Sequence, residues 1–209
     1  MKSPMRVHER ILDGIKQGVK RHWRYTKNLR NIKPEYLLTI SVADELTEGF
    51  DGICGLDLEI RLEEPTKAVS VDLMITTLGY QAYFKSPKHK VKRKGKVDIY
   101  VKHNDATSWV VELKGFDPSA TETNKEMVRL IEFLEANNGS NHCAGCFLAF
   151  PTLTDRKNWI EKKLEKLSVS PQLRITLLSE RVVTDEGADD GIPVYYANCI
   201  GIVREDVLS

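Results

Sequence analysis

The segment that decides the fold is GKVDIYVKHNDATSWVVELKG, residues 95–115. Two apolar, β-prone runs flank a polar stretch, residues 103–107, of the kind that joins the strands of a hairpin. Side chains alternate between two faces along a strand, so Glu112 and Lys114 point to the same face. A loop centred near Asp105 places Asp98 opposite Glu112. The segment therefore predicts two carboxylates and one ammonium group on a small patch of a sheet.

This patch has the composition of a divalent-metal site. Mg²⁺ takes oxygen ligands, typically one or two carboxylates together with waters and phosphate oxygens. Asp98 and Glu112 would supply the carboxylates, and the main-chain carbonyl of Leu113 would add an oxygen. A metal there would polarise a phosphodiester, and Lys114 would offset charge that builds on the phosphate. The residues leave one alternative open, a solvated hairpin face with an ordinary Glu–Lys pair.

The spacing resembles the PD-(D/E)xK motif of the restriction-endonuclease-like nuclease superfamily. Asp98 and the run Glu112-Leu113-Lys114 match the acidic and lysine positions, although the proline of the motif is absent. The resemblance covers about residues 34–150. It implies an α/β fold with a mixed β-sheet flanked by helices, in which Asp98 and Glu112 bind metal and Lys114 is catalytic. It also implies Mg²⁺ as the cofactor, with Mn²⁺ as a substitute.

The segment after Pro34 predicts a helix from Glu35 to about Glu48, with Gly49 ending it. Many members of the superfamily carry a glutamate on the helix before the sheet that completes the metal environment. The resemblance assigns this role to Glu35, with Glu45 as the reserve. The alternative is that Glu35 is simply a first-turn residue favoured by the helix dipole.

A basic run lies directly upstream of the motif. Seven basic residues occur between positions 85 and 96, separated only by small or neutral residues and His89. Such a cluster attracts phosphate, and it ends two residues before Asp98, so bound nucleic acid would be delivered to the site. A solvated basic loop is the alternative. The residues of this run predicted to bind nucleic acid are Lys88, Lys90, Lys92, Arg93, Lys94 and Lys96.

The helix that follows the motif offers a second phosphate contact. Thr123-x-x-Glu126 matches a capping box, which predicts a helix that opens there and runs to about Ala136. Asn124 and Lys125 at its start would reach a phosphate with help from the helix N-terminus.

Elsewhere the hydrophobic periodicity predicts further alternating elements. An amphipathic basic helix over residues 5–31 either faces phosphate or is simply solvated. Glu-Glu-Pro-Thr, residues 63–66, is expected to be a turn. The predicted strands are 56–62, 69–75, 146–150, 173–178 and 192–203, and a further helix covers 155–167.

Composition indicates one globular domain. The 209 residues are 41% hydrophobic and 29% charged, with a net charge of +1. Its expected parts are a basic helical extension (1–33), a nuclease-like core (34–150) and a C-terminal completion of the sheet (151–209). No apolar run approaches the roughly 18 residues that span a bilayer, and the N-terminus lacks a signal-peptide pattern. We therefore expect a cytoplasmic protein without a membrane partner.

Four cysteines, at positions 54, 143, 146 and 199, are expected to be free thiols in that compartment. Cys143 and Cys146 form a Cys-x-x-Cys pair, which binds zinc or does redox work in some proteins. No second pair with ligand spacing accompanies it, and the run Phe147 to Phe150 follows at once. The favoured interpretation is the beginning of a buried strand.

Together these features predict a metal-dependent nuclease that hydrolyses phosphodiester bonds of nucleic acid, DNA rather than RNA. Two other interpretations stay open. One is an inert nuclease-fold module that binds nucleic acid, and the other is a module whose basic loop meets an acidic protein partner. The sequence also leaves open whether the chain forms a homodimer.

Overall fold

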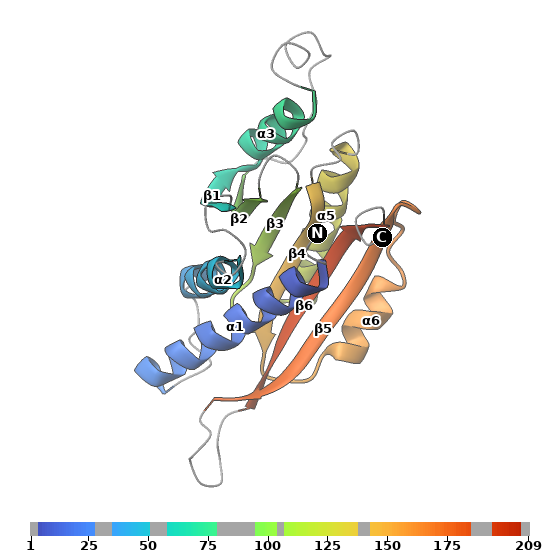
Figure 1. The fold of residues 1–209 in the computed structure, drawn as a ribbon. Coiled ribbons are helices and arrows are strands. Elements are labelled where there is room, and N and C mark those ends of the chain that lie inside the picture. The colour runs from blue at the N-terminus through green and yellow to red at the C-terminus, as the bar shows by residue number, and fades with distance from the viewer. Residues whose placement is uncertain are drawn as a thin grey trace.

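The computed structural model is built around one six-stranded sheet (Figure 1). It describes residues 4–27, 35–50, 58–78, 95–103, 107–137, 143–184 and 194–205. The helices are α1 (Pro4–Thr26), α2 (Glu35–Phe50), α3 (Thr66–Leu78), α5 (Ala120–Ala136) and α6 (Lys157–Leu164). The strands are β1 (Leu58–Pro65), β2 (Lys96–His103), β3 (Thr107–Leu113), β4 (Cys143–Thr152), β5 (Leu173–Val183) and β6 (Val194–Arg204).

The strands lie in the order β1-β2-β3-β4-β6-β5. β3 and β4 are parallel, and every other neighbouring pair is antiparallel. A parallel pair needs a crossover connection, which α5 provides between β3 and β4. The predicted α/β class, with a mixed sheet flanked by helices, is therefore confirmed.

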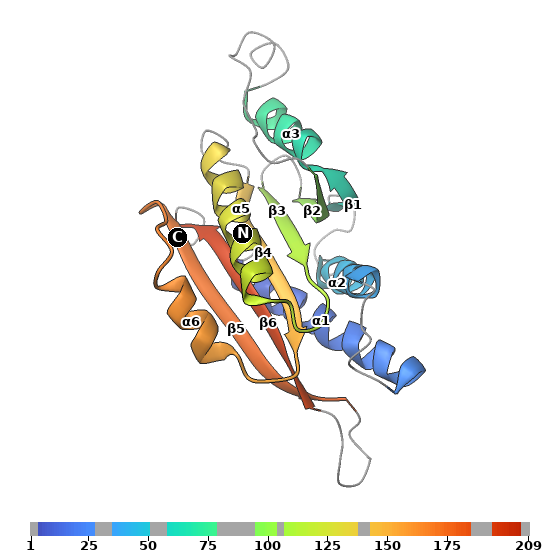
Figure 2. The same cartoon turned by 180° about the vertical axis from the view of Figure 1, so that it is seen from behind.

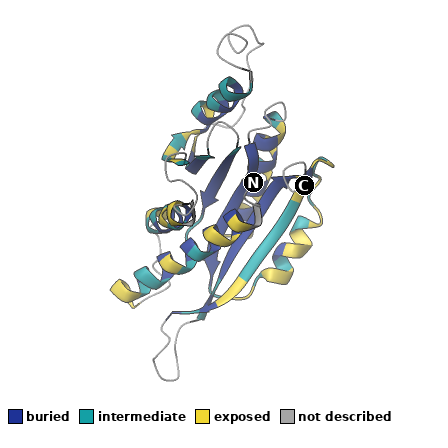
Figure 3. Cartoon of the chain, in the orientation of Figure 1, coloured by how far each residue is buried: buried dark blue, intermediate teal, exposed yellow. Residues whose placement is uncertain are grey.

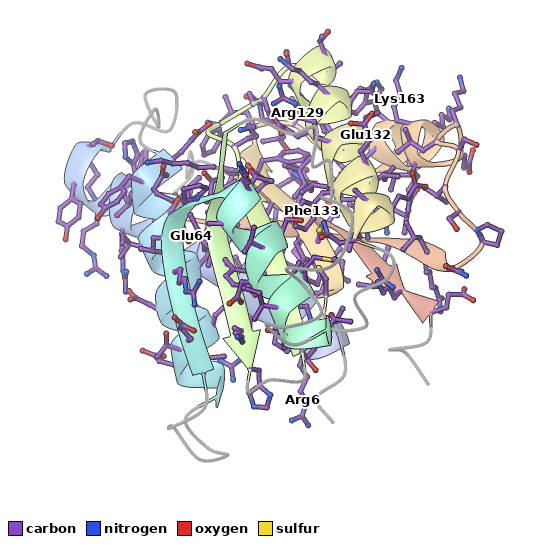
Figure 4. All side chains as sticks on the ribbon, turned by 90° about the horizontal axis from the view of Figure 1, so that it is seen from above. Arg6, Glu64, Arg129, Glu132, Phe133 and Lys163 are labelled. Carbon is purple, nitrogen blue, oxygen red and sulfur yellow. The ribbon has the colours of Figure 1, made fainter. Side chains whose placement is uncertain are left out.

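Helices cover both faces of the sheet (Figures 1 and 2). α1 and α2 pack on one face, where their apolar stripes meet side chains such as Val111 and Phe147. α5 and α6 pack on the other face, where Phe133 of α5 lies over the sheet (Figure 4). Because β4 runs between the two layers, all of its residues are buried (Figure 3). This confirms that Cys143 and Cys146 begin a buried strand.

α1 and α2 approach each other closely because α1 carries two glycines at i, i+4 spacing. A Cβ atom at Gly14 would lie 2.4 Å from the Cα atom of Val42. A Cβ atom at Gly18 would lie 2.9 Å from a methyl carbon of Leu38. At Gly14 a side chain would collide with the main chain of α2 and force the helices apart, so Gly14 sets the spacing of the pair, whereas at Gly18 the side chain of Leu38 would have to move first.

The prediction of a strand at residues 69–75 is wrong, because this segment belongs to helix α3. Its β-branched residues favour a strand locally. The buried residues of α3, however, are Thr66, Val69, Ser70, Leu73 and Met74, a spacing of three and four residues that fits one face of a helix and not the alternation of a strand. The predicted turn at residues 63–66 is also wrong: Glu63, Glu64 and Pro65 lie within β1, and Thr66 opens α3.

The predicted capping box at Thr123 is wrong as well, because α5 begins one turn earlier. Ser119 is the N-cap and forms a capping box with Glu122. Thr123 instead donates a hydrogen bond from its hydroxyl to the Ser119 carbonyl. Glu126 lies inside the helix, where it accepts a hydrogen bond from Arg129 at 2.8 Å.

The remaining elements occur near their predicted positions with shifted ends. α1 ends at Thr26 rather than residue 31, and α2 continues through Gly49 to Phe50. α6 is shorter than predicted, and β4 and β5 are longer. None of the described helices is long and apolar enough to cross a membrane.

Candidate functional site

Asp98 and Glu112 lie opposite each other on β2 and β3. The strands pair antiparallel with Ile99 against Val111, so the next position of this register sets Asp98 against Glu112. Directly opposed residues point to the same face of the sheet, which here is the α5 face occupied by the neighbouring pair Tyr100 and Val110. Glu112 is only 3% exposed. The hairpin therefore holds two carboxylates together in a largely buried position.

A main-chain hydrogen bond fixes Asp98. The N–H of Leu113 donates to Oδ2 of Asp98 at 2.6 Å. Burial raises the pKa of Asp98, while this hydrogen bond and the charge of Lys114 oppose the rise. Two neighbouring carboxylates, Glu35 and Glu63, raise the pKa further. A positive charge brought to this position would therefore be stabilised by several carboxylates.

Glu35 reaches the end of β3 from the first turn of α2. Its Oε1 accepts a hydrogen bond from the N–H of Gly115 at 3.2 Å. Glu45 lies farther along the helix and accepts a hydrogen bond from Arg10 of α1 at 3.4 Å. Of the two glutamates that the sequence offered, Glu35 is the one that lies at the end of the motif strand.

Glu63 is a neighbour of the site that the sequence interpretation missed. β1 pairs with β2 through Leu62 against Ile99 and Glu64 against Val97, so Glu63 is level with Asp98. Its backbone has a φ of 54°, in the left-handed region that non-glycine residues seldom adopt. Its carboxylate lies 3.7 Å from the ammonium group of Lys96. No local signal pointed to this position, because Glu-Glu-Pro is typical of a turn.

Lys114 follows the two carboxylates at the end of β3. Its N–H donates to the carbonyl of Ala149 at 3.0 Å, which ties the residue to β4. Its charge lowers the pKa of Asp98 against the effect of burial. It also contributes to the lowered pKa of Glu122, which is due first to the hydrogen bonds from Ser119. The ammonium group thus acts on both the motif and the first turn of α5.

Asn124 and Lys125 are exposed in the first turns of α5. Lys125, like Lys114, lowers the pKa of Glu122. These two predicted nucleic-acid ligands therefore lie at the same end of the sheet as Lys114. Lys96, at the start of β2, is exposed and pairs with Glu63. The other predicted ligands, Lys88, Lys90, Lys92, Arg93 and Lys94, lie outside the described residues.

The three carboxylates predicted to bind metal, Glu35, Asp98 and Glu112, do not form a preformed metal-binding site. Within the described ranges, no group of three or more His, Cys, Asp or Glu side chains is placed to hold a metal ion. Asp98 and Glu112 still provide two opposed carboxylates. In an extended strand the N–H and carbonyl of a residue point to the same neighbour, so the Leu113 carbonyl faces the Asp98 strand. Two carboxylates and one carbonyl fit Mg²⁺, which keeps several of its waters.

Comparisons of the chain with protein-family models, with curated proteins and with solved structures gave no match. Any functional conclusion therefore rests on the motif and on the geometry of this site.

Proposed function

We propose that this protein is a metal-dependent nuclease with a restriction-endonuclease-like fold. The observation that carries the proposal is the opposition of Asp98 and Glu112 across β2 and β3, with Lys114 two residues beyond Glu112. Glu35 supports it, since α2 brings a further carboxylate to the adjoining Gly115. A glutamate on the preceding helix is the arrangement that the resemblance to PD-(D/E)xK nucleases implies.

Each residue of the site has a role in this proposal. Mg²⁺, or Mn²⁺ in its place, supplies electrostatic polarisation of the phosphate when bound. Asp98, Glu112 and the Leu113 carbonyl would hold the cation, and the Leu113 N–H orients the Asp98 carboxylate. Lys114 presents a positive charge that offsets charge building on the phosphate during attack by water.

The substrate in this proposal is nucleic acid, DNA rather than RNA. Lys114 and Lys125 provide positive charge at the end of the sheet where the carboxylates lie. Asn124 contributes a neutral hydrogen-bonding group in the same region of α5. The basic run before β2 belongs to the same proposal on the strength of its sequence. Homodimer formation remains a prediction.

The test is an incubation of the purified protein with single- and double-stranded DNA and RNA in Mg²⁺, Mn²⁺ or chelator. We expect cleavage in either metal and none in chelator. Lys114→Ala should lower the rate at least about a hundredfold, the scale on which loss of one electrostatic contact to a transition state acts. Lys163→Ala, at a basic position on α6, is the matched control and should cleave normally. Cleavage in chelator, or full activity of Lys114→Ala, would contradict the proposal.

The absence of a three-carboxylate group among the described residues favours one alternative. In it the chain keeps a nuclease-like fold and binds nucleic acid without cutting it. Calorimetric titration with Mg²⁺ separates the two functions. A nuclease should bind the metal in a way that Glu112→Gln weakens, whereas an inert module should show no difference between the two proteins.

A further inference from the structure

The outer end of α1 extends past the edge of the sheet and carries an exposed aromatic residue. Figures 1 and 2 show the C-terminal end of this helix beyond the strands that its first turns cover. Tyr25 is 77% exposed there, and Tyr36, in the first turn of α2, is 65% exposed. Among the described residues, these two are the only aromatic side chains in the exposed class.

Tyr25 continues the packed face of α1 rather than its solvated face. Ile11, Ile15, His22 and Tyr25 recur at spacings of four, seven and three residues, which keeps them on one side of a helix. The first three of these residues are buried, whereas Tyr25 is not, because the helix has passed the sheet. Tyr25 therefore lies on the side of α1 that is buried in the earlier turns, but no described residue covers its ring.

The stretch of α1 that leads to Tyr25 is basic. From Gly14 to Lys27 the chain has five Lys and Arg residues and no acidic residue. Lys16 pairs with Asp13, and Arg21 pairs with Asp44 of α2. Arg24 and Lys27 are exposed on either side of Tyr25 in the sequence. A basic surface of this kind favours a polyanionic ligand over an uncharged, apolar one.

Tyr36 ties this surface to the candidate site. The residue before it, Glu35, accepts a hydrogen bond from Gly115 at 3.2 Å, one residue beyond Lys114. The first turn of α2, which carries Tyr36, therefore lies at the end of β3, close enough for the charge of Glu35 to raise the pKa of Asp98. The first turn of α2 and the end of β3 are far apart along the chain, and the packing of α2 in the core brings them together.

We propose that Tyr25 and Tyr36, with Arg24 and Lys27, form a platform that binds single-stranded nucleic acid and leads it to the Asp98–Glu112 site. Exposed aromatic rings stack on unpaired bases, and neighbouring basic side chains bind the backbone. A duplex hides its bases and offers these rings nothing to stack on. The inference rests on the proposed function and names its substrate class, nucleic acid with unpaired bases.

Fluorescence anisotropy with short labelled oligonucleotides tests the platform in chelator, where the binding signal does not depend on cleavage. Tyr25→Ala and Tyr36→Ala should each weaken the binding of single-stranded DNA or RNA about tenfold, the scale of one lost base stack. Tyr25→Phe and Tyr36→Phe keep the ring and should bind like the unaltered protein. Duplex binding should be the same for all of these proteins. Parallel DNA and RNA arms show which sugar the platform prefers.

The charge component has its own matched pair of variants. Lys27 lies 5.7 Å from the centroid of the Trp23 ring, and Lys163 lies 5.9 Å from that of the Trp159 ring on α6. Figure 4 shows Lys163 on the far side of the sheet from α1. Lys27→Ala should reduce the slope of log affinity against log salt by about 0.7 for one lost phosphate contact. Lys163→Ala should leave the slope unchanged.

The outcomes separate this inference from the proposed function. Single-strand binding that is equal in the unaltered protein and both Tyr→Ala variants overturns the platform, even if the protein cleaves nucleic acid. Tyrosine-dependent binding of single strands without cleavage in Mg²⁺ supports the platform and contradicts the nuclease. Binding of an acidic protein partner at α1, with no affinity for single strands, also overturns the platform.

Discussion

β3 and β4 are neighbouring parallel strands with nearly the same burial and very different contents. β4 is buried along its whole length and carries no ionisable group other than its two thiols. β3 is buried from Ser108 to Leu113 and yet contains Glu112. The register sets Glu112 directly beside Leu148, so a carboxylate and an isobutyl group occupy equivalent positions in one sheet.

The difference marks β3, rather than β4, as the strand on which the proposed chemistry depends. Burying a leucine side chain stabilises a fold by about 1.5–3 kcal/mol, whereas burying a carboxylate costs free energy unless it is paired. The raised pKa of Asp98, caused first by its burial, is the sign of that cost on the β2 side. Groups held at such a cost often mark functional sites.

The largest expected effect comes from placing a carboxylate in β4 at the position level with Glu112. Leu148→Glu places a carboxylate among apolar side chains without a built partner, which should cost about 3–5 kcal/mol. This is a large part of the stability of an ordinary domain, so urea denaturation should show a much lower midpoint or no cooperative transition. Leu148→Met, which conserves volume, should cost less than about 1.5 kcal/mol. Similar midpoints for the two variants would refute the contrast.

The reverse exchange, Glu112→Leu, removes the chemistry and keeps the burial. We expect the cleavage rate to fall at least about a hundredfold, while circular dichroism shows a folded protein. Glu122→Gln, at a fully exposed position of the α5 capping box, is the control and should cleave at the normal rate. Full activity of Glu112→Leu would show that β3 is not the catalytic strand.

Asp98→Asn should stabilise the protein at neutral pH in the presence of chelator. The folded-state pKa of Asp98 is raised, so the folded protein binds the proton more tightly than the unfolded chain does. The contribution of Asp98 to stability is therefore full below its ordinary pKa of 3.8 and is lost as pH rises through the folded-state value. Urea denaturation at several pH values should show the gain of Asp98→Asn at neutral pH and its disappearance in acid. A less stable variant at neutral pH would contradict the interpretation.

His8 provides a test for the β4 half of the comparison, because its ring packs against Phe147 of β4. Its Nε2 lies 2.7 Å from the Cys199 carbonyl and its Nδ1 3.4 Å from the Thr176 hydroxyl. Burial lowers the pKa of His8, so the unfolded chain binds the proton more tightly. Stability should therefore be full above the ordinary value of 6.5 and fall as pH drops toward the folded-state pKa. His8→Gln should lack this component when thermal midpoints of the two proteins are compared between neutral and mildly acidic pH.

The smallest expected effect is that of Glu63→Gln. The Glu63 carboxylate acts on Asp98 only through its charge, and it ranks last among the causes of the raised pKa. Removing it should raise the Mg²⁺ concentration needed for half-maximal cleavage by less than about tenfold, since exposed charges interact weakly. Glu59→Gln, whose carboxylate bonds to Arg61, should leave this concentration unchanged. A hundredfold change in Glu63→Gln would make Glu63 a direct metal ligand.

Local pattern was enough for the parts of the molecule in which neighbours in sequence are neighbours in space. The hairpin of β2 and β3 needed only alternation and a polar turn, and it set Asp98 against Glu112. The apolar run around Phe147 indicated a buried strand, and all residues of β4 are buried. The α/β class followed from the succession of segments with strand periodicity and segments with helix periodicity along the chain.

Only the tertiary structure decided the features that depend on contacts between distant segments. Val69 and Leu73 lie in a helix because a core formed by other elements buries them, against their local preference for a strand. Glu63 is level with Asp98 because β1 pairs with β2, and Glu35 meets Gly115 because α2 packs in the same core cluster as β2 and β3. The sequence by itself determined the motif pair on one hairpin. The tertiary structure decided which other carboxylates, Glu35 and Glu63, lie near that pair, because their positions depend on packing that no local period encodes.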